Sequence, residues 1–278
     1  SILGFLKSRG YSRSLITHLK RTPDGICRNH LWARVSEVVS AGDHLAVTII
    51  EPSASDILPV RLPFPIIYED ADLMIINKPA KMPVHPSQGN HGNTLANAAA
   101  YYFREQGQNF TFRCLNRLDR DTSGLLILAK HLYSASLLSE MMIKRRIHRE
   151  YWAVAKGAVP SSGTINAPIG RCSGSTIERK VDFLTGSPAV THYKCLCTKN
   201  GYSLVSLTLD TGRTHQIRVH MKHLGHPLPG DFLYCPDYSR IGRQALHSRS
   251  LSFTHPLTGA MLSFTAGLPA DMKTFSLP

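Results

Sequence analysis

The sequence predicts an α+β fold, with a mixed, largely antiparallel sheet, flanking helices and a small basic unit at the N-terminus. Apolar runs typical of strands and segments typical of helices follow one another without regular βαβ alternation and without an internal repeat. The hydrophobic content of 42% is ample for a buried core. A proline-spaced stretch separates the first part of the chain from the rest. We therefore expect a small basic domain over residues 1–52, a linker over 53–65 and a large domain over 66–278.

The N-terminal part has the pattern of short helices followed by strands. Ser12 or Ser14 can cap a short helix, and a Pro-Asp-Gly turn follows at 23–25. Alternating and β-branched residues predict strands over 31–35 and 44–50.

The large domain has clear strand and helix signals. Helices are expected to begin near Thr94 and to cover 134–145. Apolar runs predict strands over 73–76, 124–129, 151–154 and 202–209.

The charge of the chain narrows its function class. Lys and Arg total 32 and Asp and Glu total 19, which gives a net charge of +13. Such a surplus attracts polyanions, so nucleic acid is the leading partner. An anionic membrane surface is the alternative, but no lipidation signal, long basic run or strongly amphipathic basic helix supports it. No apolar stretch is long enough to cross a bilayer and no secretory leader is visible, so no membrane partner is expected.

The six cysteines show neither paired CxxC spacing nor a dense framework, so we expect reduced thiols and a cytoplasmic location. Strand alternation would place Cys195 and Cys197 on the same face.

A dense group of charged and turn-forming residues over 116–124 directly precedes a buried strand. It therefore lies on a loop at the edge of the sheet, where a rigid scaffold displays reactive groups. Asp119 stands near Arg117 and Arg120, and opposite charge keeps a carboxylate ionised. The alternative is an exposed ion-pair loop with a β-turn over 121–124.

A second group lies over 211–221. Thr214 is expected to cap a helix, with Arg213 before it and Arg218 about one turn inside. A guanidinium there can neutralise a carboxylate or bind phosphate. The alternative is a basic helix with solvated side chains.

The histidines of this region do not predict a metal site. His215, His220, His223 and His226 lack the HExxH spacing and fall on different helix faces. The serine-hydrolase elbow, the P-loop and the dinucleotide-binding glycine fingerprint are also missing from the sequence.

Five motifs in order resemble the RluA-type pseudouridine synthases, over roughly residues 66 to 265. The string RLDRDTSGLLILAK is similar to the family's signature. It is flanked by EDADLMIINKPAKMPVHP, HREYWAVAKG, TGRTHQIRVHMKHLGHPLPGD and QALHSRSLSFTHPLTG, each similar to a family segment. Residues 1–52 resemble the α-L RNA-binding module, although Ile26-Cys27-Arg28-Asn29-His30 replaces its usual strand entry.

The resemblance assigns roles to individual residues and makes 66–278 a pseudouridine synthase catalytic domain. It implies that Asp119 is the catalytic carboxylate, that Arg218 pairs with it, and that Tyr151 packs against the target base. Arg117 would reach into the RNA at the extruded uridine. Most relatives have histidine where this chain has Asn116, which affects the assignment of Arg117. Further RNA contacts are expected from Lys78, Arg120, Arg213, Arg9, Arg13, Lys20, Arg21 and Arg28.

The implied reaction isomerises uridine to pseudouridine and needs no cofactor and no metal. Asp119 would act as a nucleophile or as a base on the sugar, and the sequence leaves both routes open. The target base must be flipped out of its stack, and stacking on Tyr151 would offset part of that cost.

The expected partner is structured RNA bound by a monomer, with large-subunit ribosomal RNA favoured and transfer RNA second. The main alternative is a non-catalytic RNA-binding or ribosome-assembly protein on the same scaffold. A hydrolase that releases free uracil is a weaker alternative.

Overall fold

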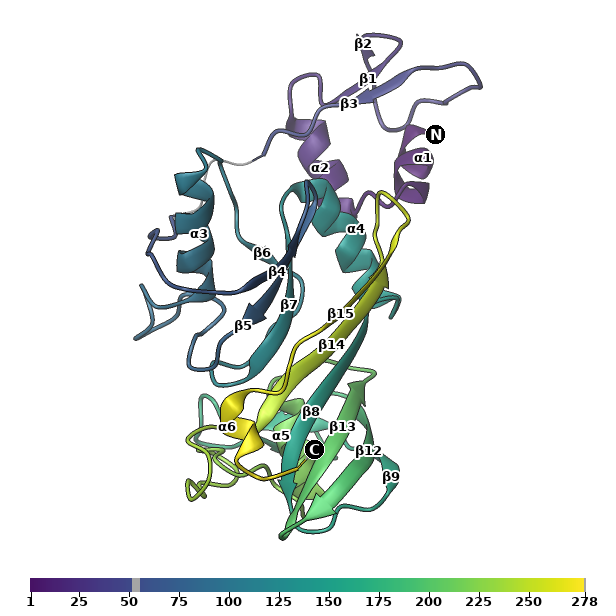
Figure 1. Cartoon of the computed structure of the whole chain (residues 1–278). Helices are drawn as coiled ribbons and strands as arrows, with labels where there is room; N and C mark the ends of the chain where they lie inside the picture. Colours follow the sequence, from purple (N-terminus) through teal and green to yellow (C-terminus); the bar gives the residue numbers. More distant parts are fainter. Residues whose placement is uncertain (52–55, 278) are drawn as a thin grey trace.

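The computed structural model describes residues 1–51 and 56–277. One sheet runs through the large part of the molecule in the strand order β4-β5-β7-β14-β8-β13-β12-β9, as Figure 1 shows. Its neighbouring strands are antiparallel except β7 and β14, which are parallel. The predicted α+β fold with a mixed, largely antiparallel sheet is confirmed.

The strands of this sheet have the following bounds: β4 (Ile66–Glu69), β5 (Leu73–Lys78), β7 (Ser123–Ala129), β14 (Leu246–Thr254), β8 (His148–Lys156), β13 (Tyr202–Leu209), β12 (Val190–Lys199) and β9 (Ser162–Asn166). Two more strands pair beside this path, β6 (Arg113–Cys114) with β7 and β15 (Met261–Thr265) with β14. A separate hairpin consists of β10 (Ile169–Arg171) and β11 (Arg179–Val181). The helices of this part are α3 (Leu95–Glu105), α4 (Leu132–Ile143), α5 (Gln216–His223) and α6 (Ala270–Lys273).

Strand β7 is buried along its whole length because helices cover both of its faces. Leu126 and Leu128 pack in the cluster that contains α3 residues, and Leu125 and Ile127 pack in the cluster that contains Leu138 of α4. A strand covered on both sides needs apolar residues at every position, which explains the continuous apolar run in its sequence. Each such side chain contributes about 1.5–3 kcal/mol on full burial.

The expected helix starts are largely confirmed. Thr94 caps α3, because its side chain accepts a hydrogen bond from the backbone N–H of Asn97. Helix α4 begins two residues before the expected start at 134. Residues 53–55 of the expected linker lie outside the described residues. The remainder, 56–65, forms neither helix nor strand and packs along α3 through hydrogen bonds such as that from Val60 N to Asn97 O.

The N-terminal part has a small core of its own, formed by Ile2, Leu6, Ile16, Leu19, Ile26 and Ala33. Its elements are α1 (Ile2–Ser8), α2 (Arg13–Arg21), β1 (Ile26–Arg28), β2 (Leu31–Trp32) and β3 (Leu45–Val47). We call residues 1–51 the N-terminal unit. Of the two expected cap residues, Ser12 and Ser14, it is Ser12 that caps α2. Its side chain accepts a hydrogen bond from the backbone N–H of Leu15.

Helix α4 holds the N-terminal unit against the large part. The N–H of Ser12 donates to Ser136 Oγ (2.8 Å), and Ser136 Oγ donates to Gly10 O (2.9 Å). The rings of Tyr11 and Tyr133 lie 4.6 Å apart. The domain boundaries at 52 and 65 stay a prediction.

Cys195 and Cys197 correct one expectation. A β-bulge between them shifts the register of β12, so Cys195 packs with the cluster that contains Val205 and Cys197 with the one that contains Leu204. The two thiols therefore lie on different faces, because the bulge breaks strand alternation. Among the described residues, no helix combines the length and apolar character needed to cross a membrane.

Candidate active site

The charged loop expected at the sheet edge connects β6 to β7 and carries Asp119. The N–H of Thr122 donates to Asp119 O (3.1 Å), which closes a turn just before β7. Gly124 has φ +112°, and a Cβ there would lie 2.2 Å from Ser248 O on the parallel strand β14. The glycine of the signature is thus required by backbone packing beneath the loop.

Asn116 anchors the other end of this loop. Its Oδ1 accepts from Ile127 N (3.0 Å) and its Nδ2 donates to Leu125 O (3.4 Å), so its side chain pairs with the backbone of β7. The residue is buried. Asn116 therefore positions the loop that carries Arg117 and Asp119.

Arg218 lies between two carboxylates. Its Nη1 donates to Asp119 Oδ2 (2.9 Å), while its Nε and Nη2 donate to the two oxygens of Asp231 (2.6 and 2.7 Å). Burial acts to lower the Arg218 pKa, but the hydrogen bonds and charges of the two carboxylates outweigh it and raise that pKa. The guanidinium therefore stays charged and fixed in orientation beside Asp119.

Asp231 is a site residue that the sequence did not reveal. Its side chain is 0% exposed, and its Oδ1 also accepts from the backbone of Leu233 (3.0 Å) and Tyr234 (3.2 Å). Gly230 before it has φ +76°, and a Cβ there would lie 2.1 Å from Arg243 O. The Gly-Asp pair at the end of the arginine motif was the available signal, since glycine often marks a close backbone approach.

Helix α5 begins differently from the expectation. The cap residue is His215 in the left-handed region (φ +59°), and Thr214 does not cap the helix. No side chain in the part of the chain that the structure describes caps the helix; Gln216 Oε1 instead accepts from Arg213 N (2.9 Å) and fixes the loop that precedes the helix. His215 Nδ1 lies 3.0 Å from Tyr234 Oη, and burial lowers the pKa of His215. A non-glycine residue with positive φ at such a place is typical of a functional site.

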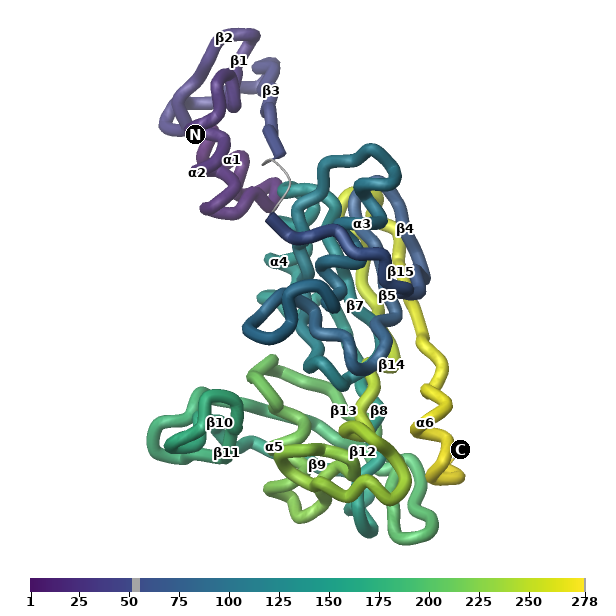
Figure 2. Tube along the Cα trace, turned by 90° about the vertical axis from the view of Figure 1, so that its left-hand side faces the viewer, coloured from purple at the N-terminus to yellow at the C-terminus, as the bar shows by residue number. Residues whose placement is uncertain are grey.

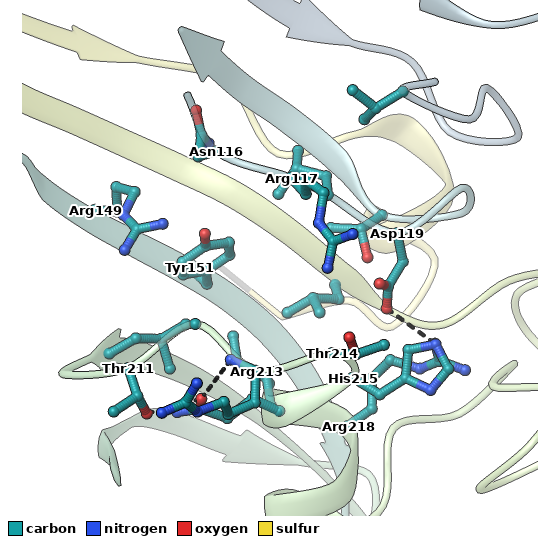
Figure 3. Close-up of a pocket in the computed structure, with 18 of the residues that line it drawn as sticks. Asn116, Arg117, Asp119, Arg149, Tyr151, Thr211, Arg213, Thr214, His215 and Arg218 are labelled. Atoms are coloured by element: carbon teal, nitrogen blue, oxygen red, sulfur yellow. Dashed lines mark hydrogen bonds and ion pairs between the residues drawn. The ribbon is translucent and has the colours of Figure 1, made fainter. Parts of the chain in front are cut away.

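Asn116, Asp119, His215 and Arg218 line a cleft of about 780 Å³. Figure 3 shows Asp119, His215 and Arg218 on one side of the cleft, with Tyr151 and Arg149 on the other. Tyr151 on β8 is only 4% exposed and packs in the apolar core cluster. Apolar side chains of Leu118, Ile217 and Leu246 complete the lining. The cleft can therefore hold a flat ring against an apolar wall with a carboxylate beside it.

Cations dominate the rim of the cleft: Arg117, Arg120, Arg145, Arg149, Arg179 and Arg213. Of these, Arg117, Arg120 and Arg213 were expected as RNA contacts. Arg149 stands two residues before Tyr151 on β8, and strand alternation places it on the same face, a signal that the sequence offered. Arg179 comes from β11, which only the folded chain brings to the cleft. Together these arginine side chains make the cleft electropositive, which suits a polyanion.

Lys78 does not fit its expected role as an RNA contact. Its side chain is fully buried, and its Nζ donates to the carbonyls of Pro79, Met82 and Arg120 (2.8, 2.8 and 2.9 Å). Burial lowers the pKa of Lys78 to about 7. The expectation is corrected because these three bonds tie two loops together and leave no path to RNA.

The basic residues expected to bind RNA in the N-terminal unit lie apart from the cleft. Arg9, Arg13, Lys20 and Arg21 are exposed, and Arg28 is half-buried and pairs with Glu37 (3.6 Å).

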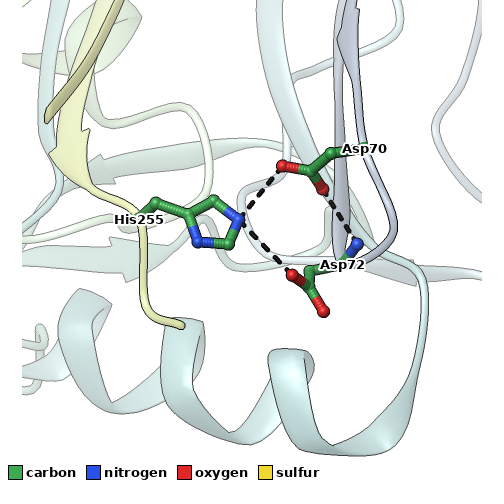
Figure 4. Close-up of side chains that lie close together, drawn as sticks. All are labelled: Asp70, Asp72 and His255. Carbon is green, nitrogen blue, oxygen red and sulfur yellow. Dashed lines mark hydrogen bonds and ion pairs between the residues drawn. The ribbon is translucent and has the colours of Figure 1, made fainter. Parts of the chain in front are cut away.

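Asp70, Asp72 and His255 are close enough together to suggest a metal site, as Figure 4 shows. His255 Nδ1 accepts from the backbone N–H groups of Leu257 (3.2 Å) and Thr258 (3.0 Å). The ring proton is therefore on Nε2, which faces Asp70 Oδ2 (3.1 Å). A metal ligand needs a lone pair at that nitrogen, so the cluster fits close contact between an N–H group and two carboxylates and not a metal.

The histidines near α5 do not converge either. His220 is buried, and its two ring nitrogens lie within hydrogen-bonding distance of Thr191 Oγ1 and Ala167 O (both 2.8 Å). His226 Nδ1 lies 2.8 Å from Lys156 O.

Known proteins resemble this chain in sequence and in structure. A family model described as RNA pseudouridylate synthase matches residues 72–223. The uncharacterized RNA pseudouridine synthase YjbO of Bacillus subtilis is 42% identical over 95% of this chain and 94% of its own. The ribosomal large subunit pseudouridine synthase D of Escherichia coli O157:H7 is 35% identical over 94% and 84%.

A solved structure agrees with these relatives. Human RNA pseudouridylate synthase domain containing 1 is 28% identical and superposes with a TM-score of 0.61, over 74% of this chain and 83% of its own. The matched region includes the loop of Asp119, strand β8 and helix α5. The chain therefore belongs to the RluA-type family of RNA pseudouridine synthases, and it is an isomerase that acts on RNA.

Proposed function

We propose that Asp119 is the catalytic carboxylate and that it acts on a uridine flipped into the cleft. The observation that carries this proposal is the pair between Asp119 Oδ2 and Arg218 Nη1 (2.9 Å) inside the electropositive cleft. Asp119 retains 28% side-chain exposure, and its Oδ1 takes no hydrogen bond from residues 1–51 or 56–277. One oxygen is thus held in place while the other can reach the sugar of a bound nucleotide.

Arg218, Tyr151 and Arg117 have distinct roles in this proposal. Arg218 orients Asp119 and places a positive charge beside the carboxylate, an arrangement that suits both the nucleophilic and the basic route. Tyr151 stacks on the flipped uracil and holds it while the N1–C1′ bond breaks and the C5–C1′ bond forms. During this exchange C5 loses a proton and N1 gains one, so atoms and electrons balance without a cofactor. Arg117 enters the gap that the uridine leaves.

The substrate that we propose is large-subunit ribosomal RNA, with transfer RNA second. Relatives at 35–38% identity are named ribosomal large subunit pseudouridine synthase D. The N-terminal unit, with its exposed cations, is proposed as an RNA-binding module that strengthens this binding.

The test compares Asp119→Asn with Asp121→Asn by mapping pseudouridine in ribosomal and transfer RNA after single turnover. Asp121 lies in the same loop and pairs with Arg120 (2.8 Å), so its substitution matches the chemical change. We expect Asp119→Asn to bind RNA normally and to form no pseudouridine, while Asp121→Asn remains active. Near-normal turnover by Asp119→Asn would refute the assignment. Free uracil among the products would point to hydrolysis instead.

A further inference from the structure

The N-terminal unit exposes a tryptophan at the tip of a tight hairpin. Strands β1 and β2 are joined by Asn29 and His30, whose φ angles of +51° and +68° are those of a two-residue hairpin turn. The turn leads into Leu31 and Trp32, which are 74% and 57% exposed. Large apolar side chains that stay exposed together are typical of interaction surfaces.

Trp32 borders a pocket of about 330 Å³ between α2 and the β1–β2 hairpin. The apolar part of its wall consists of Leu19, Ile26, Ala33 and Val35. This volume is at the small end of the range for ligand pockets, about 300–1,000 Å³. The pocket therefore suits a small flat group.

Two cations flank this pocket. Lys20 and Arg34 both line it and are both exposed, and the Arg34 guanidinium lies 5.9 Å from the centroid of the Trp32 ring. The neighbouring acid, Glu37, is engaged by Arg28 (3.6 Å) and by the backbone N–H of Arg34 (2.6 Å). The local charge is thus positive beside an aromatic ring.

We propose that this pocket is a second RNA contact, in which one unpaired nucleobase stacks on Trp32 while Lys20 and Arg34 bind the adjacent phosphates. The inference rests on the proposed RNA-binding role of the N-terminal unit and names its ligand. Every base has a π-face, so an aromatic platform accepts any of them, and cations at its edge bind the backbone. An acidic protein would find the same charges, so it is one of the outcomes that the titration below distinguishes.

The position of the N-terminal unit in the molecule is compatible with an RNA that also enters the catalytic cleft. In Figure 2 the N-terminal unit and the β10–β11 hairpin project to the same side of the molecule. Arg179 of β11 lines the catalytic cleft. An RNA that lies along this side can contact the N-terminal unit and the catalytic cleft at the same time. Because β2 and α5 lie at opposite ends of Figure 1, Trp32 affects affinity and not the chemical step.

Fluorescence tests the contact directly in the full chain. The chain has two tryptophans, so Trp152→Phe leaves Trp32 as the single indole fluorophore. Titration with a short oligouridylate should quench this fluorescence to saturation. Unchanged fluorescence while the RNA binds overturns the inference. Quenching by polyglutamate but not by the oligonucleotide overturns it in favour of an acidic protein partner.

Binding by variants gives the second arm. Trp32→Ala should weaken oligouridylate binding by about 5- to 150-fold, the range for loss of one stacked base, without changing the salt dependence. Trp32→Tyr should restore most of the affinity, and Leu31→Ala is the matched control that should bind as the wild type does. Lys20→Ala and Arg34→Ala should each reduce the slope of log affinity against log salt by about 0.7. Equal losses for Leu31→Ala and Trp32→Ala would show a general packing effect and overturn the stacking.

The outcomes for this pocket and for the catalytic proposal are separable. Pseudouridine formation by Trp32→Ala at saturating RNA should equal that of the wild type. Absence of Trp32 quenching in an active enzyme overturns the inference alone. Quenching of Trp32 by RNA in the Trp152→Phe protein, together with near-normal turnover by Asp119→Asn, overturns the catalytic proposal alone.

Discussion

Replacement of Arg218 by methionine separates the structural from the chemical role of the buried arginine. The change removes the cation that pairs with both Asp119 and Asp231. Asp231 is then left 0% exposed with a charge that nothing balances, whereas Asp119 is 28% exposed and can be hydrated. Loss of one partner from a buried pair costs about 3–5 kcal/mol, so we expect the free energy of unfolding to fall by that amount. This is a large part of the 5–15 kcal/mol typical of a folded protein.

A second variant restores the electrostatic balance without restoring the cation. In Arg218→Met with Asp231→Asn, the amide oxygen of Asn can still accept from the backbone of Leu233 and Tyr234, and no buried charge remains. Most of the lost stability should return. Activity should stay low in both variants, by about 10²–10³-fold, because Asp119 has lost the donor that orients it.

Urea unfolding and single-turnover pseudouridine formation on the folded fraction measure the two effects. Recovery of a near-normal rate in the double variant would show that Arg218 serves only the packing, and the proposed role beside Asp119 would be wrong. A single variant as stable as the wild type would contradict the buried charge of Asp231. Asp237→Asn, which removes a half-buried partner of Lys156, is the control for a carboxylate in the same segment.

Three further predictions concern the loop that carries Asp119, the buried His247 on β14 and the independence of the reaction from metal ions. Asn116→Ala leaves Ile127 N without its acceptor, so urea unfolding should show a loss of about 1–3 kcal/mol; an unchanged stability would contradict the anchoring role. Burial lowers the pKa of His247 to about 4 from 6.5, so the folded state binds fewer protons than the unfolded state between these values. Stability should therefore fall by about 3 kcal/mol from pH 6.5 to pH 4 relative to His247→Gln, and parallel pH profiles of the two proteins would refute this. Activity on prefolded RNA should survive EDTA, because His255 Nδ1 accepts two backbone N–H groups and the ring proton therefore occupies Nε2, and a loss that zinc alone restores would contradict this.

The sequence predicted elements wherever burial imposes a repeating pattern. Strand β7 is apolar at nearly every position because both of its faces are covered, and Thr94 marks the start of α3 because a helix leaves its first N–H groups unpaired. The loop of Asp119 could be located for the same reason, since it directly precedes that strand.

Features that depend on contacts between loops could not be predicted in this way. Asp231 meets Arg218 across 13 positions that include a helix end and an irregular segment, so no periodicity connects them. The burial of Lys78 depends on carbonyls from two separate loops. The bulge at Cys195 and Cys197 also leaves no compositional mark, because both residues are compatible with either face.

Helix α4 connects the N-terminal unit, for which we propose RNA binding, to the cleft. Near its start, Tyr133 and Ser136 bond to the backbone of Arg9 and Gly10, and near its end Met142 lines the cleft. A rigid helix between the two keeps RNA that is bound at the N-terminal unit in a fixed position relative to Asp119. Contacts at the N-terminal unit are expected to be equal before and during the reaction, so they raise the affinity for RNA and leave the rate at saturating RNA unchanged. The small polar contact on α4 therefore matters to the proposed reaction through position, because it determines which uridine of a bound RNA lies beside Asp119.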